Sequence, residues 1–205
     1  RGPQIEHLSE VDFPHSLGLF YGAVTQFLGF KPDSDEWKVM ALAAYAEAEN
    51  ELTGELRRLI RVHDDGSFEL ALEYFAFYNF WDRRMYSDRF VQLFGPPRRR
   101  DAPITEREYK LAAGMQRVFE ETVTKIATAL HRRTGLDRVA VSGGCFMNSV
   151  FNGKITRVTP FSECFISSCP DDSGTAVGAA MYLEAERTGD PRPFQVQHAV
   201  RAERR

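Results

Sequence analysis

The 205-residue sequence lacks the features that mark membrane, secreted or nucleic-acid-binding proteins. It has only three cysteines, a formal net charge of −3, and no apolar run long enough to cross a bilayer. An odd, small number of cysteines argues against a disulfide framework, so we expect buried free thiols in a reducing compartment. The weak net charge provides no field to attract nucleic acid or an acidic membrane. We therefore expect a cytoplasmic protein with one sizeable core, no nucleic-acid partner and no membrane association.

The strongest pattern is a short apolar run that stops at two glycines. Residues 138–141 are Arg-Val-Ala-Val, and Ser142, Gly143 and Gly144 follow directly. A β-branched apolar run that ends at paired glycines predicts a buried strand followed by a tight turn. Because glycine has no Cβ, this turn would let the backbone approach a bulky ligand closely. A helix starting near Phe146 would add free N–H groups that favour an anion there.

A second strand-to-helix corner follows later in the chain. Residues 164–167 predict another strand, and a helix rich in small residues is expected from Thr175, packed closely on a sheet. Between them lie Asp171, Asp172 and Gly174. Ligands of open α/β sheets gather at such corners, so we expect both corners to face one site. Capping of the helix by the aspartates is the structural alternative.

Apolar periodicity predicts a first helix over 17–28, with Ser16 as its N-cap and Gly29 as its C-cap. Glycine inside a helix costs about 1 kcal/mol relative to alanine. Gly18 and Gly22 therefore indicate that something approaches this helix closely. A neighbouring helix is the favoured explanation, and a ligand is the other.

Two further helices are expected. The second covers 36–45 with an irregular continuation toward Arg61, and it carries one cation, Lys38, in an apolar stretch. This lysine either extends to solvent or contacts a phosphate or carbonyl group. The longest helix is expected from the capping-box sequence at 105–108 to about Arg133.

Between the second and the longest helix, residues 47–104 are expected to form an excursion. The turn at 63–67 and the alternation over 68–72 predict a hairpin. The aromatic stretch at 75–80 either packs on the main body, which is favoured, or lines a ligand pocket. Arginines 98–100 either clamp an anion or belong to a solvated loop, which is the default.

Taken together, these separated motifs resemble the O-carbamoyltransferases of the nodulation-factor and antibiotic-tailoring type, the NodU and cephalosporin carbamoyltransferase group. The motifs that carry the resemblance are His15-Ser16-Leu17-Gly18 with Tyr21 and Thr25, Leu28-Gly29-Phe30, Lys38-Val39-Met40, Phe94-Gly95 with Pro97-Arg98, Ser142-Gly143-Gly144 with Asn148, and Asp172-Ser173-Gly174-Thr175-Ala176. The resemblance implies an α/β fold, an actin-like, sugar-kinase-like and Hsp70-like (ribonuclease H-like) lobe with a mixed sheet and flanking helices. Residues 1–187 would form the second half of that family's first domain. Residues 188–205 would be a linker or tail toward a YrdC-like domain, which is missing here.

The resemblance also implies a chemistry. In the family, the YrdC-like domain makes carbamoyl-adenylate from carbamoyl phosphate and ATP, and the first domain passes the carbamoyl group to a hydroxyl of a sugar or antibiotic. Gly143 and Gly144 match the turn beside the adenylate, Asn148 matches the asparagine that follows it, and Gly174 matches the glycine beside the nucleotide. Lys38 belongs to the Lys-Val-Met motif and is expected to bind the nucleotide with these residues, although the resemblance does not assign its contact.

The resemblance further implies a divalent metal, with iron expected and magnesium as the alternative. Asp172 matches the metal-ligating aspartate, and a carboxylate oxygen suits such a cation. The family's other ligands form a His-x-x-x-His pair in the first half of the domain. The histidines of this sequence contain no such pair: His7, His15, His63, His131 and His198. The catalytic base is likewise expected elsewhere, so no catalytic residue is assigned.

We therefore expect this chain to hold half a cleft and to be inactive alone, and the sequence leaves homo-oligomerisation open. One departure is that the family's Gly-Leu-Ala-Pro-Tyr-Gly is Ala-Leu-Ala-Ala-Tyr-Ala at 41–46, which reshapes that loop. Two alternatives stay open. One is an ATP-dependent kinase of the same fold. The other is a non-catalytic nucleotide-binding or scaffold module.

Overall fold

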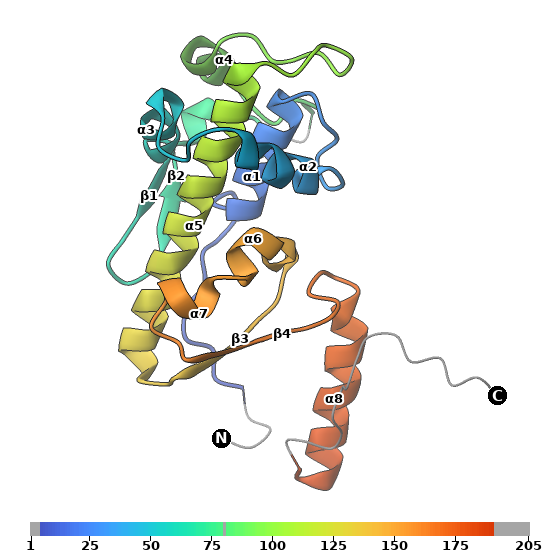
Figure 1. Ribbon diagram of the computed structural model, residues 1–205. Helices are drawn as coiled ribbons and strands as arrows, with labels where there is room; N and C mark the ends of the chain where they lie inside the picture. Colours follow the sequence, from blue (N-terminus) through green and yellow to red (C-terminus); the bar gives the residue numbers. More distant parts are fainter. Residues whose placement is uncertain (1–4, 80, 191–205) are drawn as a thin grey trace, which may run out of the picture.

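The computed structural model describes residues 5–79 and 81–190, and they are organised along one long helix (Figure 1). This helix, α5 (Glu106–Thr134), extends from the upper, mainly helical part to the lower sheet. The predicted capping box starts it, with the Thr105 N–H donating to a Glu108 carboxylate oxygen at 2.9 Å. The predicted end is also confirmed, because Gly135 adopts a left-handed conformation with φ 63°.

Helices pack along the upper half of α5 and enclose most of the apolar core. They are α1 (Leu17–Phe27), α2 (Glu36–Leu42), the 3₁₀ turn η1 (Ala43–Tyr45) and α3 (Glu51–Arg57). The predicted N-cap of α1 is confirmed, because the Ser16 hydroxyl accepts the Leu19 N–H at 3.3 Å. Gly29, with φ 77°, directly follows the C-cap residue and ends the helix where the sequence predicts.

The excursion contains the predicted hairpin and packs on the core. Strands β1 (Ile60–Val62) and β2 (Phe68–Leu70) pair antiparallel, and η2 (Leu72–Tyr74) and α4 (Asp88–Phe94) follow. The buried Phe75 ring meets Phe20 of α1 edge-on, with centroids 5.3 Å apart. Packing, the favoured explanation for the aromatic stretch, is confirmed for Phe75.

The lower part contains both predicted strands of the candidate site. Strand β3 (Arg138–Val141) pairs in parallel with β4 (Glu163–Ile166), and η3 (Gly144–Met147), α6 (Ser149–Asn152) and α7 (Ile155–Val158) connect them. Near Phe146, where the sequence left open whether a helix begins, the 3₁₀ turn η3 comes first. The four-residue helix α6 then begins at Ser149, after Asn148 leaves helical geometry at ψ 89°.

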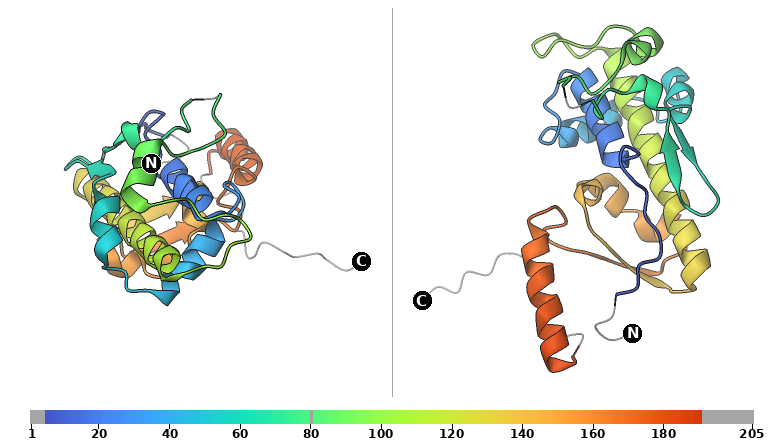
Figure 2. Two further views of the ribbon diagram at one scale, coloured as in Figure 1. Left: turned by 90° about the horizontal axis from the view of Figure 1, so that it is seen from above. Right: turned by 180° about the vertical axis from the view of Figure 1, so that it is seen from behind.

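Helix α8 (Gly174–Thr188) forms as predicted, but it does not pack closely on the sheet. Ala185 is its one buried residue, and nothing lies within 4 Å of a Cβ built on Gly178. Both views in Figure 2 show α8 to one side of the main body. The physical reason is that β3 and β4 make only a two-stranded sheet, which offers a narrow surface.

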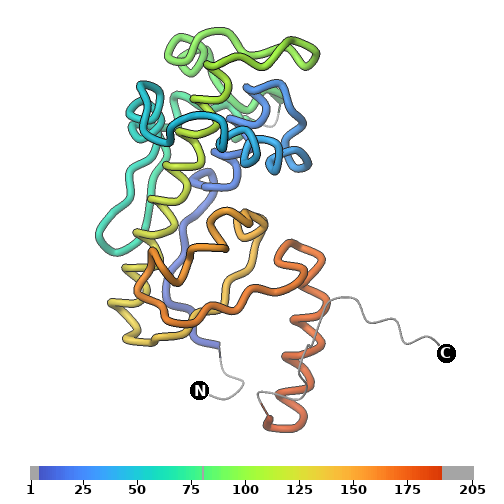
Figure 3. Tube along the Cα trace, in the orientation of Figure 1, coloured from blue at the N-terminus to red at the C-terminus, as the bar shows by residue number. Residues whose placement is uncertain are grey.

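The single mixed sheet expected from the resemblance is not found among the described residues. They form two separate two-stranded sheets, one antiparallel and one parallel, which lie on different segments of the trace in Figure 3. The α/β class is confirmed, whereas the actin-like assignment stays a prediction. Of the expected linker over 188–205, residues 191–205 lie outside the described residues. Among the described helices, none combines the length and apolar character that a membrane span requires.

Candidate functional site

The two strand-to-helix corners meet, as the sequence predicts. The Gly143 N–H and the Ser142 hydroxyl both donate to the carbonyl oxygen of Pro170, at 2.5 and 2.9 Å. These bonds hold the turn after β3 against the turn after β4. They form because adjacent parallel strands bring their carboxyl ends to the same edge.

Above this edge lies a cleft of about 890 Å³. Its walls come from the start of α1, the segment 33–40, the turn after β3 and the corner before α8. Gly144, Asn148 and Asp172, three of the predicted site residues, line it. The sequence thus identified one wall correctly. In the wall at 33–40 it selected Lys38, which does not line the cleft, and it missed Asp33, Glu36 and Trp37, which do.

The predicted glycines have three different roles. Gly143 adopts φ 100°, a conformation that side chains rarely accept. Gly144 has open space around a built Cβ and lines the cleft, so a ligand can approach its backbone. A Cβ on Gly174 would collide with the carbonyl oxygen of Cys169. Gly143 and Gly174 do not belong to the cleft lining and instead permit the two turns to form.

The two α1 glycines are approached by different segments of the chain. A Cβ on Gly18 would lie 3.7 Å from Cys145 Sγ, and Gly18 itself lines the cleft. A Cβ on Gly22 would lie 3.2 Å from the terminal methyl of Met85. Glu36 of the neighbouring helix α2 also approaches this position, with its Oε1 3.8 Å from the built Cβ. The favoured explanation, close packing of another helix, therefore holds only in part, at Gly22.

Asn148 is held at the cleft by three side-chain hydrogen bonds. Its Oδ1 accepts the Phe151 N–H at 3.0 Å and Gln116 Nε2 at 3.1 Å, and its Nδ2 donates to Gln116 Oε1 at 2.8 Å. It is also the N-cap residue of α6. The contacts with Gln116 join residues far apart in the sequence, so local patterns could not predict them.

The two aspartates of the second corner differ in their bonding. Asp171 Oδ1 accepts the N–H and the hydroxyl of Ser173, at 3.1 and 2.5 Å. These bonds stabilise the turn that precedes α8. They are not the predicted helix cap, because the N-cap residue of α8 is Ser173 and no side chain caps the helix. Within the described residues, the Asp172 carboxylate makes no hydrogen bond or ion pair, and it lines the cleft. Asp172 is therefore the carboxylate free to bind a ligand.

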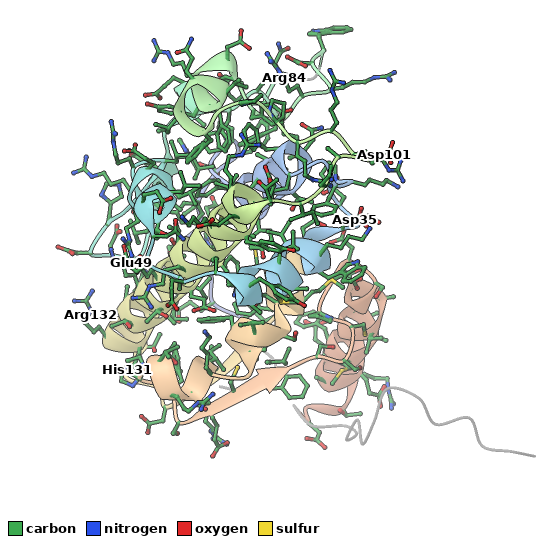
Figure 4. The ribbon with its side chains drawn as sticks, turned by 45° about the horizontal axis from the view of Figure 1, so that its top comes forward. Asp35, Glu49, Arg84, Asp101, His131 and Arg132 are labelled. Carbon is green, nitrogen blue, oxygen red and sulfur yellow. The ribbon has the colours of Figure 1, made fainter. Side chains whose placement is uncertain are left out.

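Lys38 and Arg98 are engaged away from the cleft lining. Lys38 Nζ lies 3.0 Å from an Asp35 carboxylate oxygen and 5.4 Å from the Trp37 ring centre. Asp35 lies at the edge of the molecule (Figure 4). Arg98 Nε donates to the Leu28 carbonyl at 2.6 Å and so fixes its loop to the end of α1. A ligand contact for Lys38 stays a prediction.

The cleft is acidic. Its described lining contains four carboxylates, those of Asp33, Glu36, Asp171 and Asp172, and no lysine, arginine or histidine. The Asp33 N–H donates to Glu36 Oε1 at 2.8 Å and orients that carboxylate. Burial, Glu36 and Glu120 together raise the pKa of the Tyr21 phenol, which stays protonated.

Burial also raises the pKa of the Cys145 thiol, the other titratable group with a shifted pKa in the lining. A protonated thiol is a poor nucleophile, because the thiolate is the reactive form. The three cysteines are free, as predicted, although each is only half-buried. The geometry therefore gives Cys145 a packing role beside Gly18.

A complete metal site is not formed by the described residues. They contain no group of three or more His, Cys, Asp or Glu side chains that could hold an ion. Histidines 7, 15, 63 and 131 do not line the cleft. His131, at the C-terminal end of α5 in Figure 4, packs its ring against Phe161 at 5.4 Å. Asp172 alone offers an uncommitted carboxylate at the corner.

Comparisons with known proteins agree with the motifs. The family model described as carbamoyltransferase N-terminus matches residues 2–181. The chain is 37% identical over 193 residues to an uncharacterized protein of Synechocystis, covering 91% of this chain and 31% of that protein. It is 30% identical over 187 residues to the nodulation protein NolO of Bradyrhizobium diazoefficiens, covering 89% of this chain and 31% of that protein.

A third relative is named as an enzyme. The 3′-hydroxymethylcephem-O-carbamoyltransferase of Streptomyces clavuligerus is 29% identical over 167 residues, covering 80% of this chain and 28% of that protein. The chain thus spans less than a third of the length of each of these relatives. The family match covers most of the sequence and includes both corners of the cleft. The chain belongs to the carbamoyltransferase N-terminus family.

Proposed function

We propose that this chain forms one wall of a carbamoyl-adenylate site in an O-carbamoyltransferase. The observation that carries the proposal is the cleft in which the Gly143–Gly144 turn meets the Asp171–Asp172 corner. Its volume of about 890 Å³ is in the range of small-molecule pockets. Family membership favours carbamoyl transfer over the kinase and scaffold alternatives.

The cleft offers contacts suited to such a ligand. The backbone at Gly144 is open to close approach, as a flat base or a ribose needs. Asn148 retains one amide hydrogen that could donate to a phosphate or carbonyl oxygen. Tyr21 adds an uncharged phenol to the lining of the cleft.

The charge of the cleft supports a bound divalent cation. An adenylate phosphate next to four carboxylates is repelled unless a cation lies between them. Asp172 would provide one oxygen ligand, which suits iron or magnesium. The remaining ligands would come from outside the described residues. When bound, the cation would neutralise the charge that develops on the leaving adenylate.

The attacking hydroxyl and its base are proposals about a larger protein. The names of the relatives, a nodulation protein and a cephem O-carbamoyltransferase, support a sugar or natural-product hydroxyl as the acceptor. A hydroxyl nucleophile needs a general base. In this cleft Glu36 and Asp171 accept hydrogen bonds within turns and Asp172 is assigned to the cation, and the resemblance places the family's base in the first half of the domain. We therefore propose that the base, like the other metal ligands, lies outside this chain, and that the chain alone does not transfer carbamoyl groups.

Calorimetric titration of this chain with AMP in the presence of Mg²⁺ tests the proposal. We expect Gly144→Val to weaken AMP binding by more than about tenfold, because the new side chain fills the approach space. Gly178→Val is the matched control, since Gly178 also has open space around a built Cβ but lies on α8 outside the cleft lining. Equal AMP affinity in wild type and Gly144→Val, or no AMP binding by the wild-type chain, would contradict the proposed site.

A further inference from the structure

A buried glutamine connects Tyr21 and Asn148, which line the cleft, to an ion pair outside the cleft lining. Gln116 lies on α5 with only 5% of its surface exposed. Its Oε1 accepts from the Tyr21 hydroxyl at 3.1 Å and from Asn148 Nδ2 at 2.8 Å. Its Nε2 donates to Asn148 Oδ1 at 3.1 Å and to Glu120 Oε1 at 2.9 Å. All four hydrogen-bonding positions of the amide are therefore used within the protein.

The ion pair determines which way the Gln116 amide points. Glu120 Oε1 lies 2.6 Å from Lys154 Nζ, and a carboxylate in an ion pair can only accept hydrogen bonds. The donor end of Gln116, Nε2, must therefore face Glu120. Its Oε1 is thereby turned toward Tyr21 and the Nδ2 of Asn148.

The Asn148 amide is fixed by the same logic. The Phe151 N–H is a donor, so Asn148 Oδ1 must face it. Gln116 reinforces this orientation, because it pairs its own donor with Oδ1 and its own acceptor with Nδ2. A reversed Asn148 would place two donors against each other and lose the pairing on both sides. One Nδ2 hydrogen remains without an acceptor among the described residues, and Asn148 lines the cleft.

We infer that Gln116 is a positioning residue for ligand binding. It does not line the cleft, and it acts by holding Asn148 so that the remaining amide hydrogen donates to an acceptor oxygen of the ligand. The inference rests on the proposed nucleotide site for the identity of that ligand, whose phosphate or carbonyl oxygen is the acceptor. The arrangement itself is a property of the free chain.

The first test therefore uses the free chain. We would record the side-chain amide resonances of Asn148 by ¹H–¹⁵N NMR in wild type and in Gln116→Leu. The wild type should show one protected Asn148 amide hydrogen, and Gln116→Leu should shift both hydrogens and remove the protection. The control is Gln26→Leu, which also removes a glutamine bonded at both ends, to Arg83 O and to the Met85 N–H, away from the cleft. Unchanged Asn148 resonances in Gln116→Leu would overturn the inference.

The second test adds AMP. Loss of a hydrogen bond to a charged group corresponds to a loss in affinity of about tenfold or more. We expect this loss in Gln116→Leu and in Asn148→Ala, and wild-type AMP affinity in Gln26→Leu. If Asn148→Ala loses affinity and Gln116→Leu does not, Asn148 binds the ligand without help and the inference is wrong. If the wild type does not bind AMP, the proposed nucleotide site fails, while the free-chain spectra still decide whether Gln116 positions Asn148.

A second variant covers the case in which Gln116→Leu does not fold. Glu120→Ala removes the acceptor that orients Gln116 and leaves the glutamine in place. Its thermal unfolding would be compared with that of wild type before the spectra are recorded. We expect the Asn148 side-chain resonances to shift in folded Glu120→Ala, and unchanged resonances would contradict the orienting role of the Glu120–Lys154 pair.

Discussion

At the scale of single residues, Gly143 and Gly144 are neighbours with different constraints. The sequence predicts a tight turn there because two consecutive glycines after an apolar run rarely occur within a strand. It does not tell which glycine is needed for conformation. The structure does, because Gly143 has φ 100° whereas a Cβ on Gly144 would meet nothing within 4 Å.

This difference leads to a prediction about stability. Gly143→Ala should lower the free energy of unfolding by about 1–2 kcal/mol, since alanine is strained at positive φ. Gly144→Ala should change it by less than about 0.5 kcal/mol, as expected for an unconstrained surface position. Urea unfolding of both variants measures the two values. Equal destabilisation by the two substitutions would show that the turn is not constrained in this way.

The two aspartates give a second prediction at the residue scale. Mg²⁺ should strengthen AMP binding by the wild type, and Asp172→Asn should lose that enhancement while its thermal unfolding stays as in wild type. The reason is that the Asp172 carboxylate has no bond within the described residues that the substitution could break. Calorimetry with AMP, with and without Mg²⁺, measures the effect. An undiminished Mg²⁺ enhancement in Asp172→Asn would remove this residue from the proposed ligand set.

At the scale of elements, the long helix shows what local sequence can predict. The capping box, the apolar face and the terminal glycine of α5 all depend on residues within a few positions of one another. The same holds for the β1–β2 hairpin and for the start of α1. The pairing of Asn148 with Gln116, in contrast, joins distant segments, and local sequence could not predict it.

The capping box gives a pH-dependent prediction. Burial raises the pKa of Glu108, but the hydrogen bonds from Thr105 and Arg107 outweigh it, so the pKa is lowered overall. A lowered carboxyl pKa contributes stability above the unfolded value of about 4.3, and this stability is lost as the pH falls through the folded value.

Glu108→Gln should therefore lower the free energy of unfolding by about 1 kcal/mol at pH 7, a typical contribution of a helix cap. The difference from wild type should begin to shrink below the unfolded value of about 4.3 and should be lost once the pH falls through the lowered folded pKa, where the wild-type carboxyl is neutral. Urea unfolding at several pH values measures it, with Glu106→Gln as a control on an exposed carboxylate of the same turn. A difference that stays constant with pH would contradict the assigned role.

Helix α8 provides the second prediction at the element scale. The amide hydrogens of α8 should exchange with solvent faster than those in the middle of α5, because α8 buries only Ala185 whereas α5 buries twelve residues. Hydrogen exchange followed by mass spectrometry compares the two helices within one sample. Similar protection in both would show that α8 is held more firmly than its exposed surface indicates.

At the scale of the whole molecule, the cleft results from segments that are distant in the sequence. Residues 33–40, the turn after β3 and the corner before α8 meet only in the fold. Their motifs could be identified separately, but their arrangement, the acidic lining and the position of Lys38 outside it depend on long-range packing. The same holds for the loose position of α8, which periodicity alone could not predict.

The central claim is that the cleft at the two corners binds the adenylate, and backbone NMR tests it most directly. The ¹H–¹⁵N spectrum of the chain would be followed during titration with AMP in the presence of Mg²⁺. Our account predicts that the largest shifts cluster at Gly144, Cys145, Asn148 and Asp172, on both corners of one cleft. Shifts confined to other surfaces, or no shifts at saturating AMP, would contradict it.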